Sequence, residues 1–303
     1  MVVSSKTDLR FPMPGQRGHG SRNTHTEEAK GKMLIQDRKQ RLERIRRFSL
    51  MSDEFMPVVL QDPQACQYVL RVLTGRKDLI LKEVRTQYRI SKASSRDVIL
   101  DVLVEDMKGH LYNIEIQVRS SGIDHARRTR FHGAMIDSEM LQKGTEFQDL
   151  PEVWIIYISE QDLWKQGKVV YHVKKTLEGT EVTYDDGLHM TYVNAAVKED
   201  SEVGRMMEYF RTADPNDMSH GALSERVHFL KCEEGGAEIM CKIAEEFREE
   251  GRREGRMEGH HTALRETALN LKKMGMASEL IAQAIGKSLE QLKIFMEEPE
   301  SNG

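Results

Sequence analysis

Residues Val98 to Arg119 read VILDVLVEDMKGHLYNIEIQVR, and this stretch decides the fold prediction. Each arm alternates apolar and polar side chains, and successive side chains of a strand point to opposite faces. Between the arms, Met107-Lys108-Gly109 suits a three-residue loop with the glycine in the left-handed conformation. We therefore predict a β-hairpin with one apolar face and one acidic face.

Two carboxylates occupy opposed positions on the acidic face. The predicted register places Asp101 opposite Glu115, and Gln117 follows on the same face as Glu115. Directly opposed residues have Cβ atoms about 4.5–5.5 Å apart, and carboxylates that close repel unless a positive charge lies between them. Mg²⁺, with Mn²⁺ as an alternative, suits such hard oxygen ligands. The other interpretation is a hydrated polar face, but Asp is a poor strand residue and an opposed Glu makes it worse.

Composition bounds the class of protein. The 303 residues suffice for one sizeable core with tails or for two small domains. The net charge of −4 argues against a generic nucleic-acid coat protein, yet twelve Lys and Arg residues precede Leu50 against five acidic ones. We read residues 1–48 as a basic leader, either a nucleic-acid arm or a solvated, disordered tail, and favour the tail.

Cysteine usage and hydropathy indicate the compartment. The three cysteines form no CxxC pair, which predicts a reducing environment without a disulfide framework. No apolar run approaches the roughly 18 residues that a membrane span needs, and the N-terminus has no apolar segment of the secretory type. We expect a cytoplasmic protein with no membrane contact.

The order of elements predicts the architecture. Asp62-Pro63 is a helix start and Gly75 a helix stop. The apolar run Val153 to Ile158 suits the centre of a sheet. Strands are also expected at 79–88, in the two arms of the hairpin between Val98 and Arg119, and at 169–173 and 190–193, and helices at 124–143, 202–210, 224–229 and 239–248. This order predicts an α/β fold over residues 49–248, a mixed sheet with helices on its faces.

The C-terminal part differs in composition. In residues 249–262, glycines recur every four residues at Gly251, Gly255 and Gly259, and each costs a helix about 1 kcal/mol relative to Ala. We predict a marginal helical linker there and short helices in residues 263–303. The last two helices suit either a DNA-reading helix-turn-helix or a helical pair that docks on its own domain or a second copy. Because the final helix offers phosphates only Lys287 and Lys293, we favour docking and a homo-oligomer.

Four features in this order resemble the PD-(D/E)XK nuclease superfamily, and within it the transposase-like, recombination-promoting nucleases of mobile elements. They are MSDEFMPVVL (51–60), LDVLVEDMKGHLYNIEIQV (100–118), the helix and strand from Arg128 to Ile158, and EGRREGRMEG (250–259). The resemblance extends over roughly Ser49 to Phe295. It implies a restriction-endonuclease-like mixed sheet and a metal-dependent endonuclease that acts on DNA.

The resemblance also assigns roles to residues. It gives Asp101 and Glu115 to the metal, Gln117 to the catalytic position usually held by Lys, and Arg128 to phosphate binding. Related nucleases often use an acidic residue of the first helix, but here that helix has Gln64 and Gln67 and no Glu, so none is assigned.

Three functional hypotheses follow. The leading one is a Mg²⁺-dependent DNA endonuclease. The alternative is a catalytically degenerate DNA-binding or oligomeric module on the same fold, in which Gln117 and the missing helix acid mark lost chemistry. A third is a protein-interaction module built on the C-terminal helices.

Overall fold

The computed structural model describes Gln40, Glu43 and residues 45–92, 96–118, 124–141, 144 and 146–297. The chain divides into two units, residues 1–48 and 49–303, and all elements named below belong to the second. The predicted basic leader lies almost wholly outside the described residues. No described helix is both long enough and apolar enough to cross a membrane.

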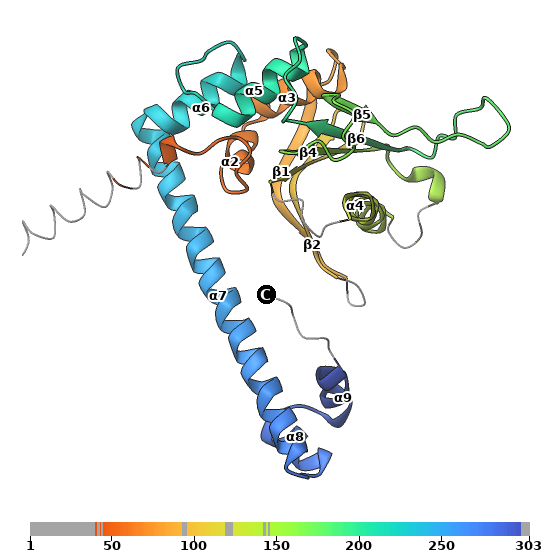
Figure 1. The fold of residues 1–303 in the computed structure, drawn as a ribbon, viewed down its shortest axis with the longest axis vertical. Helices are drawn as coiled ribbons and strands as arrows, with labels where there is room; N and C mark the ends of the chain where they lie inside the picture. The colour runs from red at the N-terminus through yellow and green to blue at the C-terminus, as the bar shows by residue number, and fades with distance from the viewer. Residues whose placement is uncertain are drawn as a thin grey trace, which may run out of the picture. The chain divides into compact units, whose positions relative to one another are not determined.

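Six strands form one mixed sheet in the order β1-β2-β3-β4-β6-β5. Neighbours from β1 to β3 are antiparallel, β3, β4 and β6 run parallel, and β5 is antiparallel to β6. The predicted α/β architecture, a mixed sheet flanked by helices, is confirmed (Figure 1). The strands are β1 (Leu81–Ile90), β2 (Val98–Asp106), β3 (Leu111–Gln117), β4 (Val153–Ser159), β5 (Val170–His172) and β6 (Leu188–Asn194).

Helices cover both faces of the sheet. Helix α4 connects β3 to β4 and lies on one face, and α2 and α3 lie on the other, with α5 and α6 packed on α3 (Figure 1). The start of α3 forms as predicted, because the Asp62 side chain accepts the backbone N–H groups of Gln64 and Ala65, and Gly75 ends it at φ +69°. The bounds are α2 (Met56–Leu60), α3 (Pro63–Thr74), α4 (His125–Met140), α5 (Glu202–Thr212) and α6 (Ala222–Cys232).

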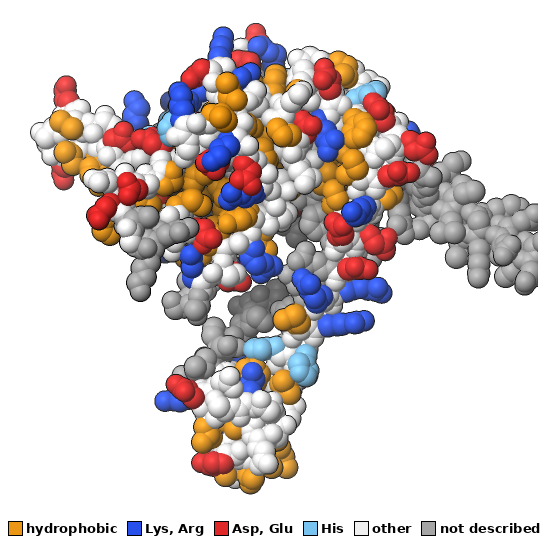
Figure 2. All heavy atoms as spheres, turned by 180° about the vertical axis from the view of Figure 1, so that it is seen from behind, with side chains coloured by type: hydrophobic (Ala, Val, Ile, Leu, Met, Phe, Trp, Pro, Cys, Tyr) orange, Lys and Arg blue, Asp and Glu red, His pale blue; other side chains and the backbone are white. Residues whose placement is uncertain are grey.

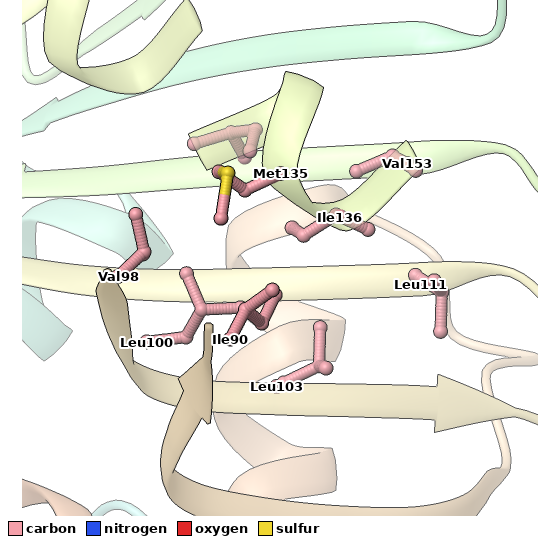
Figure 3. Close-up of a cluster of buried hydrophobic side chains, with 9 residues drawn as sticks. Ile90, Val98, Leu100, Leu103, Leu111, Met135, Ile136 and Val153 are labelled. Carbon is pink, nitrogen blue, oxygen red and sulfur yellow. The ribbon is translucent and has the colours of Figure 1, made fainter. Parts of the chain in front are cut away.

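An apolar cluster fixes α4 against the sheet. Figure 3 shows Met135 and Ile136 of α4 directed toward side chains of the strands. The cluster comprises Ile90, Val98, Leu100, Leu103, Leu111, Met135, Ile136, Val153 and Ile155, all buried. Burial of each such side chain contributes about 1.5–3 kcal/mol. Because α4 is held in this way, its polar residues one and two turns earlier lie over β3.

The predicted hairpin register is confirmed where the two strands pair. The Cα partners run from Glu105–Leu111 through Val102–Ile114, and Gly109 takes φ +81° in the turn. The ladder ends there, so Asp101 and Glu115 are the next opposed positions. On the other side of β2, the pairs Thr86–Val102 and Tyr88–Leu100 put Gln87 across from Asp101, and Gln87 itself has φ +51°.

The C-terminal helices depart from the sequence prediction. A single helix, α7, runs without a break from Glu234 to Lys273, whereas the prediction was a helix at 239–248 followed by a marginal helical linker at 249–262. Helix propagation adds one hydrogen bond for each residue fixed, and this outweighs the isolated glycines. Gly275 and Gly286 then separate α7, α8 (Ser278–Ala284) and α9 (Leu289–Glu297), as predicted. A small core joins the three helices, formed by Ala268, Ile281, Ala282, Ile285, Leu292 and Phe295.

Candidate active site

Where the backbone pairing of β2 and β3 ends, two carboxylates accept the backbone hydrogen bonds instead. The Asp101 carboxylate accepts the Ile116 N–H at 3.0 Å, and the Glu115 carboxylate accepts the Asp101 N–H at 3.2 Å. Each side chain is therefore held by the opposite strand. The structure brings Asp101 and Glu115 together, as the sequence predicted, and fixes both with backbone donors.

Glu115 is fully buried, and its second oxygen, Oε2, has no hydrogen-bond partner among the described residues. Two nitrogen-bearing side chains of α4 lie near it: Arg128 Nη2 is 3.7 Å from Oε2, and His132 Nδ1 is 3.5 Å from Oε1. A buried acceptor without a donor is costly. Such an atom is the kind that a bound cation or an ordered water satisfies.

The environment disfavours the charged form of Asp101. Burial raises the pKa of Asp101 to about 8, and the negative charge of Glu115 adds to the shift, while the Ile116 N–H and Arg128 oppose it. Without a cation, the pair therefore retains a proton near neutral pH. To ionise both carboxylates near neutral pH, a positive charge from outside β2 and β3 is needed.

Asp53 also contributes to the field at Asp101, since its charge raises the pKa of the Asp101 carboxyl further. Sequence reasoning missed it, because the acidic residue was sought within α3. Gln67 of that helix has a structural role, since its Oε1 accepts the Leu81 N–H at 3.0 Å. The available signal was the segment MSDEFMPVVL, in which Asp53 lies three residues before the start of α2.

Arg128 lies against Gln117. Its Nη1 donates a hydrogen bond to Gln117 Oε1 at 2.8 Å, and its side chain is 38% exposed. The guanidinium thus contacts Gln117 and Glu115 at once while it remains open to solvent. The cation that Gln117 cannot supply is present beside it.

A tyrosine from the central strand completes this surface. Tyr157 donates to Gln117 Oε1 at 3.3 Å, and its hydroxyl lies 2.8 Å from His125 Nδ1. Burial raises the pKa of Tyr157 to about 12, so the hydroxyl stays protonated as a donor. The sequence placed Tyr157 within the apolar run Val153 to Ile158 of a central strand and gave its hydroxyl no role. The pairing of Glu115 with Tyr157 in the parallel ladder explains the proximity.

The site therefore collects residues from four elements and one connecting segment: Asp101 of β2, Glu115 and Gln117 of β3, Tyr157 of β4, Arg128 and His132 of α4, and Asp53 in the segment before α2. The family described as PD-(D/E)XK nuclease family transposase matches residues 73–248, which hold all of these except Asp53. No curated protein and no solved structure matches the chain. The match spans more than half of the 303 residues, and the chain belongs to the PD-(D/E)XK nuclease family transposases.

Proposed function

We propose that this protein is a divalent-metal-dependent DNA endonuclease that hydrolyses phosphodiester bonds at the Asp101–Glu115 site. One observation carries the proposal: a fully buried Glu115 with an unpartnered oxygen lies beside Asp101 and within 3.7 Å of the Arg128 guanidinium. Two acidic oxygen ligands and an adjacent cation form a pattern suited to phosphoryl chemistry.

The donor set fits Mg²⁺ or Mn²⁺. Mg²⁺ is usually bound by one or two carboxylates and completes its shell with water and substrate phosphates. Asp101 and Glu115 would supply those two carboxylates. Among the described residues, no three His, Cys, Asp or Glu side chains are grouped to hold a metal by themselves. When bound, the ion would supply charge that polarises a phosphoryl oxygen and acidifies water.

The other residues act on the substrate. The Gln117 amide nitrogen can only donate hydrogen bonds, which suits a phosphate oxygen or the attacking water. Arg128 neutralises negative charge on the phosphate, a role that an uncharged amide cannot fill. Tyr157 holds the Gln117 carbonyl oxygen by a hydrogen bond.

DNA would reach the site along α4. Three arginines, Arg127, Arg128 and Arg130, lie within its first two turns, and phosphate contacts of this kind position a duplex without reading its sequence. Elsewhere, Figure 2 shows basic and acidic side chains interspersed on the face in view. Binding that depends on a few cations should weaken steeply with salt.

Nicking of supercoiled plasmid tests the proposal. The full chain should cleave in Mg²⁺ or Mn²⁺ and not in EDTA, and Asp101→Asn and Glu115→Gln should abolish cleavage while they unfold at or above the wild-type temperature. Full metal-dependent cleavage by Asp101→Asn would show that this site does not carry out the reaction.

The alternative remains a catalytically degenerate DNA-binding module. Gln117 favours it, because an amide stands where the superfamily usually has Lys. It predicts salt-sensitive DNA binding by the wild-type chain with no cleavage in either metal. The two functions therefore separate in one set of assays.

Self-association through the C-terminal helices is a second proposal for this chain. Leu280 and Leu289 are 56% and 49% exposed, and Figure 2 shows hydrophobic side chains on these helices. Leu280→Glu and Leu289→Glu should lower the mass measured by light scattering. Because α7 passes unbroken through Arg248, these substitutions test the surface without cutting a helix.

A further inference from the structure

Unpartnered polar atoms concentrate between β3 and α4. The described residues contain seven buried side-chain nitrogen and oxygen atoms without a hydrogen-bond partner, and four belong to Asn113, Glu115 and His132. These side chains are 0%, 0% and 5% exposed. Because native proteins rarely leave such atoms unsatisfied, the concentration in one place points to a local function.

The geometry links His132 to Glu115. His132 Nδ1 lies 3.5 Å from Glu115 Oε1, and it has no hydrogen-bond partner among the described residues. This separation exceeds that of a formed hydrogen bond. In the absence of ligands, however, hydrogen bonds of active sites are often long and shorten in the complex.

Glu115 has two distinct oxygens. Oε1 already accepts the Asp101 N–H and faces His132, whereas Oε2 has no donor. A second donor on Oε1 would fix the rotation of the carboxylate and direct Oε2 toward a cation. Arg128 is less suited to this task, because it is 38% exposed and its Nη1 is engaged by Gln117.

We propose that His132 is a positioning residue, whose Nδ1–H donates to Glu115 Oε1 and orients Oε2 for the divalent cation. The inference rests on the proposed function, since it concerns the same cation. Outer groups that orient metal ligands typically change metal affinity by about 10- to 100-fold when they are mutated. His132 lies one helical turn after Arg128, so α4 contributes both the exposed cation and the buried orienting group.

Three substitutions separate hydrogen bonding from packing. In His132→Asn the amide nitrogen can occupy the place of Nδ1, in His132→Gln it lies nearer the place of Nε2, and His132→Leu has no donor. We expect Mn²⁺ binding, measured by calorimetry on the full chain without DNA, to weaken about 10- to 100-fold in His132→Leu. His132→Gln should resemble His132→Leu, and His132→Asn should stay close to wild type. Thermal unfolding in EDTA checks that each variant is folded.

The outcomes distinguish this inference from the proposed function. Equal Mn²⁺ affinity in wild type and His132→Leu would overturn the positioning role alone, as would an equal loss in His132→Asn and His132→Leu. If wild type and Asp101→Asn both fail to bind Mn²⁺, the proposed metal site is wrong and the inference fails with it.

A measurement on the unmodified protein covers variants that do not fold. Long-range ¹H–¹⁵N spectra of the histidine rings should show His132 with hydrogen on Nδ1, and its shift should change when Mg²⁺ is added. A His132 ring with bare Nδ1, or one that is unaffected by Mg²⁺, would contradict the proposal.

Discussion

The Arg128 guanidinium donates a 2.8 Å hydrogen bond to the side-chain carbonyl of Gln117. Gln117 of β3 and Arg128 of α4 thereby form one polar group at the candidate site. The strand supplies a neutral amide, and α4 supplies the positive charge next to it. In the proposed reaction, catalysis would therefore depend on a contact between elements rather than on the hairpin alone.

Loss of the Arg128 charge should slow cleavage. We expect Arg128→Met to lower the single-turnover nicking rate by about 10²-fold, the usual effect of removing one charge-stabilising donor. The double variant Gln117→Lys/Arg128→Met should regain part of the rate, because it returns a cation to the same place. Arg130→Met, an exposed arginine of the same helix, is the matched control. Equal losses for Arg128→Met and Arg130→Met would indicate general attraction of DNA.

The raised pKa of Asp101 predicts a pH-dependent stability in EDTA. The folded value is about 8, and the unfolded value is about 3.9. Between these values the folded state binds more protons, so the Asp101 contribution falls as pH rises from about 4 to 8 and is constant below that range. The free energy of unfolding of Asp101→Asn relative to wild type should therefore be higher at pH 8 than at pH 5. Urea titrations at both pH values measure it, and an unchanged difference would contradict the prediction.

Asp53 should strengthen cation binding through its charge. Asp53→Asn is expected to weaken Mn²⁺ binding about tenfold, which corresponds to about 1.4 kcal/mol, and to lower the pKa of Asp101. Its neighbour Glu54 is also exposed and serves as the matched control in Glu54→Gln. Calorimetric titration of both variants decides the matter, since equal affinities would leave Asp53 without a part in the site.

The buried amide of Asn113 should lower the stability of the protein. Its amide is fully buried, and neither polar atom has a partner, while Leu103 and Ile155 are its cross-strand neighbours. Each unsatisfied buried polar group costs about 1–3 kcal/mol, so Asn113→Leu should raise the free energy of unfolding by a similar amount. Denaturant titration measures this. Lower stability in Asn113→Leu would instead reveal a buried water on the amide.

The glycines of α7 give a test of the unbroken helix. A Cβ added at Gly255 would meet no atom of the described residues within 4 Å, whereas at Gly236 it would clash with the Phe229 carbonyl oxygen. Gly255→Ala should therefore stabilise the helix by about 1 kcal/mol, and Gly236→Ala should destabilise the protein. Circular dichroism during thermal unfolding compares the two. Destabilisation by Gly255→Ala would show that another surface packs against that helix.

The sequence predicted those parts of the site that local chemistry decides. The alternation of residues 98–118 and the Gly109 turn fix the hairpin, and the hairpin fixes Asp101 and Glu115. Contacts between elements were beyond this reasoning. Tyr157 reaches Gln117 only because β3 and β4 pair in parallel register, and Asp53 acts from a segment almost fifty residues before Asp101.

The helix bounds show the same difference between local signals and contacts between elements. Asp62-Pro63 and Gly75 are local signals, and α3 has those ends. In α7 the glycine penalties are small beside the hydrogen bonds that propagate through them, so residue preferences alone suggested a marginal helical linker where the structure has one continuous helix. The orientation of α4, set by its apolar cluster with the sheet, likewise has no local signal.

The reciprocal hydrogen bonds of Asp101 and Glu115 have a consequence for folding. Strand side chains alternate with a period of two, so a slip of one residue between β2 and β3 would send one carboxylate to the opposite face. A slipped hairpin would thus lose both the Ile116 contact and the paired oxygens. A divalent ion bound at the proposed site during refolding would therefore favour molecules with native pairing over those with shifted strands.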